Sequence, residues 1–188
     1  MRELAQNVMD LAQNALAAGA DKISVELRED FFNGTLVLRV ADNGRGMTAE
    51  QTARAADPFY TTRPGKLTGL GLSLLREEAK RTGGSLTVIS QENNGTAVTA
   101  EFSLHSVDLP PVGDVNGVIR LLLCCNPETD FTFVRARREK SGTEKRFCLD
   151  RRTLRDILGD RLPLSNPAAS VPIEEWLSRR TEQLADRK

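Results

Sequence analysis

The sequence has few cysteines, a single histidine and no excess of either charge, and these shortages exclude several classes of protein. Its 188 residues include three cysteines and one histidine, with 26 Lys and Arg against 26 Asp and Glu. An odd cysteine count without a secretion signal argues against a disulfide framework. A net charge of zero gives no support to a binder of nucleic acid or of an anionic membrane, because both require excess positive charge.

Long apolar runs are also missing. No stretch approaches the ~18 apolar residues of a transmembrane helix, and residues 1–10 are amphipathic and contain acidic side chains, unlike a signal peptide. We therefore expect a cytoplasmic protein that does not bind membranes. Hydrophobic residues make up 39% of the chain, enough to exclude intrinsic disorder. We expect Cys124, Cys125 and Cys148 to be buried thiols rather than metal ligands, since sequence neighbours such as the first two point in different directions.

Hydrophobic spacing predicts the elements of the first half of the chain. Helical spacing indicates helices over residues 1–16 and 72–82, and the capping-box pattern at residues 48–51 begins a short helix between them. Alternation predicts strands over 23–27, 35–41, 85–91 and 96–104. Residues 58–71 are rich in glycine, threonine and basic side chains and therefore indicate a loop. Hairpins mixed with helices predict an α+β protein with a largely antiparallel sheet and helices on one face.

The second half of the chain predicts a smaller set of elements. Residues 105–113 contain Pro110-Pro111 and indicate a linker. We expect helices over 114–125, 151–158 and 170–185, and strands over 130–138 and 144–149. Ser170 is the expected N-cap of the last helix. These elements are sufficient for a small α+β unit, and the pattern leaves open whether that unit is separate or packs on the first sheet.

The first segment with chemical potential lies on the opening helix. Asp10 and Asn14 are four residues apart and therefore share a helix face. An Asn carbonyl suits Mg²⁺ that keeps most of its water, and a carboxylate one turn earlier is placed to deprotonate a water or hydroxyl. A solvated pair on an exposed helix face is the simpler interpretation of these two residues alone.

The second segment follows an apolar strand. Asp42 is followed by Asn43-Gly44-Arg45-Gly46-Met47, in which the glycines permit a tight turn and close approach of a ligand. A carboxylate at the strand end accepts a hydrogen bond from an exocyclic amino group, which adenine has at N6 and guanine does not. A β-turn without a ligand is the alternative.

Two further segments are suited to phosphate. Residues 57–63 (DPFYTTR) supply hydroxyls and a guanidinium, and residues 68–72 (TGLGL) lead into a helix whose first N–H groups form an anion site. The P-loop pattern and the G-x-G-x-x-G fingerprint are both absent from the sequence.

In this order, the four segments resemble the N box, first glycine box, F box and second glycine box of the GHKL ATP-binding superfamily, which includes gyrase, chaperone, mismatch-repair and sensor histidine kinase ATPase domains. Gly95-Thr96 resembles its last glycine-containing box. DPFYTTR…TGLGL is most similar to the histidine-kinase branch, HATPase_c, with a short lid. The resemblance implies a two-layer α/β sandwich over residues 1–105 and a small α+β extension over 106–188.

The resemblance also implies roles for individual residues, with ATP or ADP and Mg²⁺ as cofactors. Asn14 matches the Mg²⁺ ligand, and Asp10 matches the general base of hydrolysing members, although many kinases differ there. Asp42 matches the adenine-reading aspartate, and Thr96 shares that contact. The other residues expected to bind nucleotide are Gly44, Gly46 and Met47 around the base, Thr61, Thr62, Arg63 and Lys66 in the lid, and Gly69, Leu70, Gly71 and Leu72 at the helix start.

The departures from the histidine-kinase pattern limit the expected function. The chain begins at the N-box helix, so we expect no upstream hairpin with a phospho-accepting histidine. The single histidine, His105, follows the last strand of the domain and is interpreted as a linker residue. Autophosphorylation on histidine within the chain is therefore not expected.

Two functions remain open at this stage. One is slow ATP hydrolysis or phosphoryl transfer to a separate protein partner, and the other is a non-catalytic nucleotide-sensing or assembly module. Residues 109–114 (LPPVGD) and 164–167 (LSNP) resemble small stand-alone bacterial ATP-binding proteins often found beside iron-hydrogenase subunits. A regulatory or hydrogenase-related protein partner is therefore expected. A DNA-associated ATPase is disfavoured because the net charge is zero.

Overall fold

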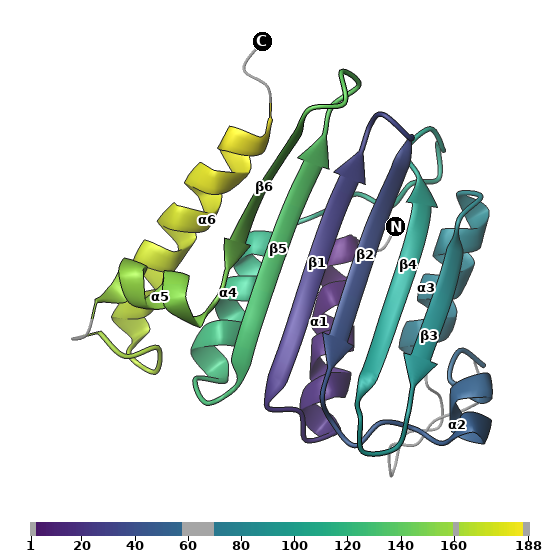
Figure 1. Cartoon of the computed structure of the whole chain (residues 1–188), viewed down its shortest axis with the longest axis horizontal. Helices are drawn as coiled ribbons and strands as arrows, with labels where there is room; N and C mark the ends of the chain where they lie inside the picture. The colour runs from purple at the N-terminus through teal and green to yellow at the C-terminus, as the bar shows by residue number, and fades with distance from the viewer. Residues whose placement is uncertain (1–2, 58–69, 160–161, 186–188) are drawn as a thin grey trace.

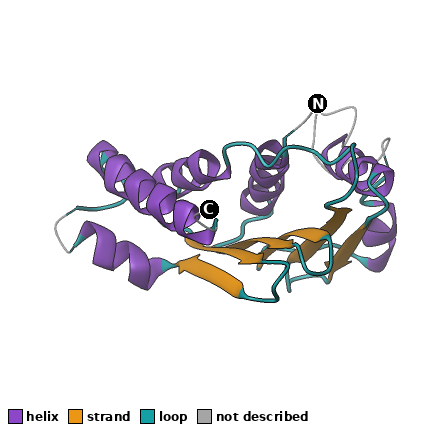
Figure 2. Ribbon diagram, turned by 90° about the horizontal axis from the view of Figure 1, so that it is seen from above, coloured by secondary structure: helices purple, strands orange, loops and turns teal. Residues whose placement is uncertain are grey.

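The chain forms one six-stranded sheet with its helices packed mainly on one face (Figures 1 and 2). The computed structural model describes residues 3–57, 70–159 and 162–185. The strands are β1 (Lys22–Asp30), β2 (Thr35–Asp42), β3 (Ser85–Ser90), β4 (Thr96–Ser103), β5 (Asp130–Arg138) and β6 (Glu144–Leu149). The helices are α1 (Leu4–Ala17), α2 (Ala49–Arg54), α3 (Leu70–Arg81), α4 (Val115–Cys125), α5 (Arg151–Leu158) and α6 (Ser170–Leu184), with a 3₁₀ turn at Pro167–Ala169.

The strand order is β3-β4-β2-β1-β5-β6, and the sheet is mixed. Neighbouring strands are antiparallel except for β1 and β5, which run parallel. A parallel neighbour requires a crossover connection, which here is supplied by the linker after β4 and by α4. The α+β class and the mixed, largely antiparallel sheet with helices on one face are confirmed.

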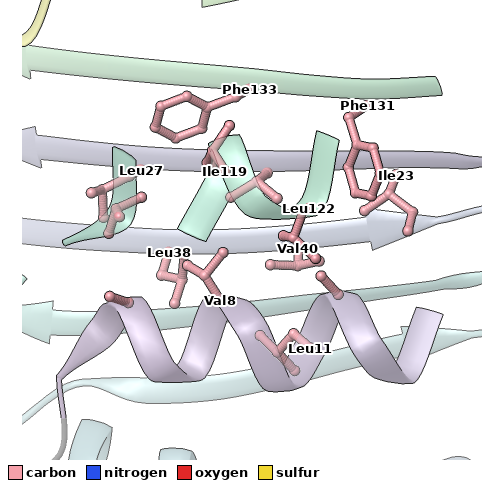
Figure 3. Close-up of a cluster of buried hydrophobic side chains, with 14 of the residues drawn as sticks. Val8, Leu11, Ile23, Leu27, Leu38, Val40, Ile119, Leu122, Phe131 and Phe133 are labelled. Atoms are coloured by element: carbon pink, nitrogen blue, oxygen red, sulfur yellow. The ribbon is translucent and has the colours of Figure 1, made fainter. Parts of the chain in front are cut away.

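The C-terminal region continues the first sheet. The pairing of β5 with β1 extends from Lys22↔Asp130 to Asp30↔Arg138. A single core joins the two parts of the chain: Val8 and Leu38 lie in the same buried cluster as Ile119 and Phe133 (Figure 3). The open question about the second half is therefore answered, because its hairpin extends the sheet and its helices complete the same apolar layer.

The linker after β4 crosses back to the start of α1. The N–H groups of Leu4 and Ala5 donate to the carbonyls of Pro111 and Val112 at 2.9 and 3.0 Å. The first N–H groups of a helix have no partner within the helix. The linker carbonyls supply acceptors for two of these N–H groups. Asp114 then caps α4 by accepting from the N–H of Gly117 at 2.8 Å.

Several local predictions are confirmed and two are wrong. Thr48 and Gln51 form the predicted capping box of α2, and β5, β6 and α5 have the predicted bounds. Ser170 is the first residue of α6 and not its N-cap, because the 3₁₀ turn capped by Asn166 runs directly into the helix.

The predicted burial of the cysteines is the second error. Cys125 and Cys148 are exposed free thiols and Cys124 is half-buried. Cys148 alternates with the buried Phe147 and Leu149 on β6, so it faces away from the helices. No helix in the described part of the chain is long and apolar enough to cross a membrane.

Candidate functional site

The candidate site lies where β2 ends beside the start of β4. Asp42 is the last residue of β2 and faces Thr96, the first residue of β4, across the antiparallel ladder. One carboxylate oxygen of Asp42, Oδ1, accepts a hydrogen bond from the Gly44 N–H at 2.8 Å. The hydroxyl of Thr96 lies 2.9 Å from that of Ser90 on β3. Two of the predicted residues, Asp42 and Thr96, are therefore neighbours, and Ser90 is a partner of Thr96 that the sequence did not indicate.

The environment of Asp42 changes its acidity. Burial raises the pKa of the Asp42 carboxyl above its ordinary value, while backbone hydrogen bonds from Gly44 and Thr96 lower the pKa by less. Desolvation disfavours the charged form, whereas N–H donors favour it. The result is a half-buried carboxylate at a strand end, and groups of this type are found disproportionately at binding sites.

Two glycines allow the loops after β2 and β3 to touch. Gly46 has φ +64°, and a Cβ there would lie 1.9 Å from the carbonyl oxygen of Gln91. Gly95 has φ +80°, and a Cβ there would lie 1.9 Å from the carbonyl oxygen of Asp42. Both residues combine a left-handed backbone with a contact too close for any side chain. The backbones of the first and last glycine boxes are therefore packed directly against each other.

The loop after Asp42 is also fixed to α1 and β1. Gly44 lies against Ala18, since a Cβ at Gly44 would be 2.9 Å from both the Cβ and the carbonyl oxygen of Ala18. The side-chain oxygen of Asn43 accepts from the N–H groups of Asp21 and Lys22 at 3.1 and 2.9 Å, and its amide donates to the Asp21 carboxylate at 2.6 Å. Sequence reasoning assigned no role to Asn43, and only its position within the glycine box could have indicated one.

Helices α1 and α3 bring the N box to the second glycine box. A Cβ on Gly71 would lie 3.6 Å from Oδ2 of Asp10, so the first turn of α3 is next to this carboxylate. Further along the same helix pair, the Asn7 side chain donates to Oε2 of Glu78 at 3.0 Å. Asn7 is 2% exposed and Glu78 is 8% exposed. This buried polar pair was also missed, because it joins residues 71 positions apart in the sequence.

The remaining predicted residues fall into two groups. Asn14 is exposed near the end of α1, Met47 is half-buried in the loop before α2, and Leu72 packs against the core from α3. The backbone of Leu70 begins α3. The other predicted positions, Thr61, Thr62, Arg63, Lys66 and Gly69, lie outside the described residues.

The side chains available as metal ligands limit which metal ions the protein could bind. Within residues 3–57, 70–159 and 162–185, no group of three or more His, Cys, Asp or Glu side chains could hold an ion. Mg²⁺ needs no such cage, since it keeps several waters and is bound through one or two protein oxygens plus substrate phosphates. An exposed Asn14 carbonyl, one turn after Asp10, fits that mode of binding.

Comparison with known proteins gives similarities in sequence and in fold. The chain is 27% identical over 110 residues to the sensor histidine kinase ZraS of Escherichia coli (strain K12), a match that covers 58% of this chain and 23% of that protein. It is 34% identical over 89 residues to the sensor protein ChvG of Agrobacterium fabrum, covering 45% of this chain and 15% of that protein. The chain thus spans less than a quarter of the length of these relatives.

One solved structure matches over most of the chain. The N-terminal domain of a DNA repair protein superposes with a TM-score of 0.59 at 16% identity, covering 85% of this chain and 58% of that one. This likeness concerns the fold alone and extends beyond the nucleotide boxes into the C-terminal region. The family model described as "Histidine kinase-, DNA gyrase B-, and HSP90-like ATPase" matches residues 1–106. With the interlocked glycine boxes and more than half of the chain matched, the protein belongs to this ATPase family.

Proposed function

We propose that the chain binds Mg·ATP between α1, α3 and the loop after β2, and that it hydrolyses ATP slowly or transfers its phosphoryl group to a separate protein. The observation that carries this proposal is the half-buried carboxylate of Asp42, facing Thr96 and enclosed by glycines that leave no room for side chains. A site of this shape takes a flat ligand edge that offers a hydrogen-bond donor.

The base end of the site selects adenine. Gly44 donates to one oxygen of Asp42, and the adenine amino group donates to the carboxylate in the proposed complex. Guanine presents a carbonyl at the same position, which would leave the charge of Asp42 buried without that donor. Leaving a buried charge short of one hydrogen bond costs on the order of 2–4 kcal/mol, or about thirtyfold to nine-hundredfold in affinity.

The phosphate end lies between α1 and α3. The first turn of α3 approaches Asp10 at Gly71, and the free N–H groups of a helix start attract phosphate oxygens. Asn14 would hold Mg²⁺, which when bound neutralises phosphate charge. Asp10 would accept the proton of the attacking water or hydroxyl. Predicted contacts from Thr61, Thr62, Arg63, Lys66 and Gly69 belong to the same proposal.

Nucleotide binding is tested by thermal unfolding with Mg·ATP, Mg·ADP and Mg·GTP. At about 100 times Kd, a ligand adds about 2.7 kcal/mol to the free energy of unfolding, so we expect a rise in Tm with ATP or ADP and little with GTP. Asp42→Asn should remove the rise. Glu101→Gln, a neutralisation on an exposed position of β4, is the matched control and should keep it. Equal shifts with ATP and GTP would contradict the adenine assignment.

Turnover is tested by ADP production. Asp10→Asn should lower the rate by about a hundredfold or more while the Mg·ATP-induced rise in Tm is retained. The same assay separates the alternative, a nucleotide-sensing or assembly module, for which the wild-type protein produces no ADP even with candidate partners. The continuous pairing of β1 with β5 favours keeping that alternative, because it joins the site to the C-terminal region through one sheet. A regulatory or hydrogenase-related partner stays a prediction.

A further inference from the structure

The end of the sheet opposite β3 carries a cleft that the nucleotide proposal does not use. It has a volume of about 650 Å³ and lies between the edge strand β6 and the helices α5 and α6, which are adjacent in Figure 1. Three successive residues of β6, Arg146, Phe147 and Cys148, line it. Successive strand residues point to opposite faces, so a cleft that touches all three follows the backbone edge of the strand.

The hairpin register shows which backbone groups point to that edge. The Glu139 N–H donates to the Thr143 carbonyl at 2.9 Å, which makes 139 and 143 a hydrogen-bonded pair. In an antiparallel ladder such pairs alternate with pairs whose N–H and C=O groups point outward. With Ala136↔Arg146 and Val134↔Cys148 in register, Arg146 and Cys148 are outward-pointing and Phe147 is bonded to β5.

Little within the described part of the chain occupies these outward groups. The Cys148 carbonyl accepts from the Thr153 hydroxyl at 3.4 Å, which confirms its outward direction. No described residue accepts a hydrogen bond from the N–H of Arg146 or Cys148. An edge strand with available N–H and C=O groups is a template for an added strand.

The side chains around the cleft define the chemistry of such a strand. Phe147 faces the helices and makes an edge-to-face contact with Trp176 on α6, with ring centroids 5.5 Å apart. The lining on the helix side also includes Ile157 of α5. A residue of an added strand that points to the helices therefore meets an apolar surface.

The charged side chains around the cleft determine which residues suit the face of the added strand that points away from the helices. Arg146 is exposed and, like Cys148, points away from the helices, so strand residues on that face meet a guanidinium. The carboxylates of Asp156 and Glu175 lie on the helix side of the cleft and disfavour acidic residues there, although Arg179 and Arg180 lie at the same rim. An acidic side chain is thus accepted beside Arg146 and an apolar one beside Trp176.

We propose that this cleft binds an extended segment of a partner protein, in which acidic residues alternate with apolar ones, by adding it as a strand to β6. The outward N–H groups of Arg146 and Cys148 donate to the segment, and alternate side chains contact Arg146 and Trp176. Binding is expected to weaken with added salt, since an exposed charge pair contributes. This surface does not depend on the proposed nucleotide site.

The experiment uses the full chain and a short fluorescein-labelled peptide in which glutamate alternates with valine. Fluorescence anisotropy should detect binding, and a peptide with lysine in place of glutamate should bind at least about tenfold more weakly. Arg146→Glu should cause a similar loss, whereas Arg155→Glu, the same charge change at an exposed α5 position outside the cleft, should not. Equal binding of the lysine peptide would overturn the acidic specificity.

Strand addition is tested separately from charge. Cys148→Pro removes one outward N–H at an edge position that tolerates proline and should weaken binding by about tenfold, whereas Cys148→Ala should bind normally. In hydrogen exchange, the Arg146 and Cys148 amides should become protected by peptide, while Phe147 is protected in both states. Unchanged binding by Cys148→Pro, or no new protection, would overturn the proposal. If the wild type forms a concentration-dependent dimer that Cys148→Pro abolishes, the β6 edge pairs with a second copy of this chain. That result would overturn the proposal that it binds a segment of a partner protein.

Discussion

The proposed nucleotide site and the proposed strand-binding cleft are built in different ways. Where β2 ends beside β4, backbone geometry makes the proposed nucleotide site: Gly46 and Gly95 have positive φ, and each lies too close to a carbonyl of a neighbouring segment to carry a side chain. At the β6 end, an edge strand and two helices form a cleft with side chains of ordinary conformation. The first arrangement requires glycine at fixed positions, while the second is lined by side chains from three elements that are separate in the sequence. One end is therefore recognisable from motifs and the other is visible only in the fold.

The largest expected effect on stability comes from comparing a glycine in the proposed nucleotide site with one near the β6 cleft. Gly95→Ala combines a left-handed φ of +80° with a Cβ placed 1.9 Å from the Asp42 carbonyl. It should lower the free energy of unfolding by more than about 3 kcal/mol. Gly159→Ala, after α5, has φ +66° and ψ −177° with nothing within 4 Å, and should cost less, about 1–3 kcal/mol from backbone strain alone. Chemical denaturation measures both. Similar losses would show that the interlocked loops are not close-packed.

The next effect concerns the polar contact between α1 and α3. Asn7→Leu removes a donor from the buried Glu78 carboxylate and should lower the free energy of unfolding by about 1–3 kcal/mol. The double variant Asn7→Leu/Glu78→Leu should recover most of that loss, because no buried charge remains without its partner. Urea denaturation of the wild type, Asn7→Leu, Glu78→Leu and the double variant completes a double-mutant cycle. Additive losses in the two single variants would contradict a direct interaction.

A smaller effect is expected at the start of α2. Thr48→Ala removes the side chain that accepts from the Gln51 N–H, one half of the capping box. We expect a loss of about 1 kcal/mol in the free energy of unfolding, the usual contribution of an N-cap. Thr48→Ser keeps the acceptor and serves as the control in thermal unfolding. If both variants lose the same stability, the methyl group and not the cap is responsible.

The smallest effect is a pH dependence at Asp42. Its pKa is raised in the folded protein, so the ionised carboxylate destabilises the folded state at neutral pH. That penalty begins to shrink as pH falls through the folded pKa and is gone below the unfolded pKa. Asp42→Asn has no such titration. The stability gain of Asp42→Asn over wild type should therefore be greatest near neutral pH and shrink on acidification. A gain that grew on acidification would indicate a lowered pKa instead.

Elements that depend on short-range interactions were predicted correctly, and features that depend on neighbouring elements were not. The capping box at Thr48 and the bounds of β5, β6 and α5 depend on residues within one turn or one strand, and they were predicted correctly. Ser170 failed as an N-cap because a 3₁₀ turn precedes the helix, and the cysteines failed because β6 is an edge strand with one exposed face. Both errors concern how an element joins its surroundings.

By itself, the sequence determined the periodicity of each element and the order of the glycine boxes, because side-chain spacing and glycine positions are local properties of the chain. Only the tertiary structure decided that β5 pairs with β1, that Asn7 meets Glu78, and that the N–H groups of Arg146 and Cys148 point outward. Each of these depends on register between segments far apart in the chain, and register follows from how a whole sheet and its apolar layer pack together.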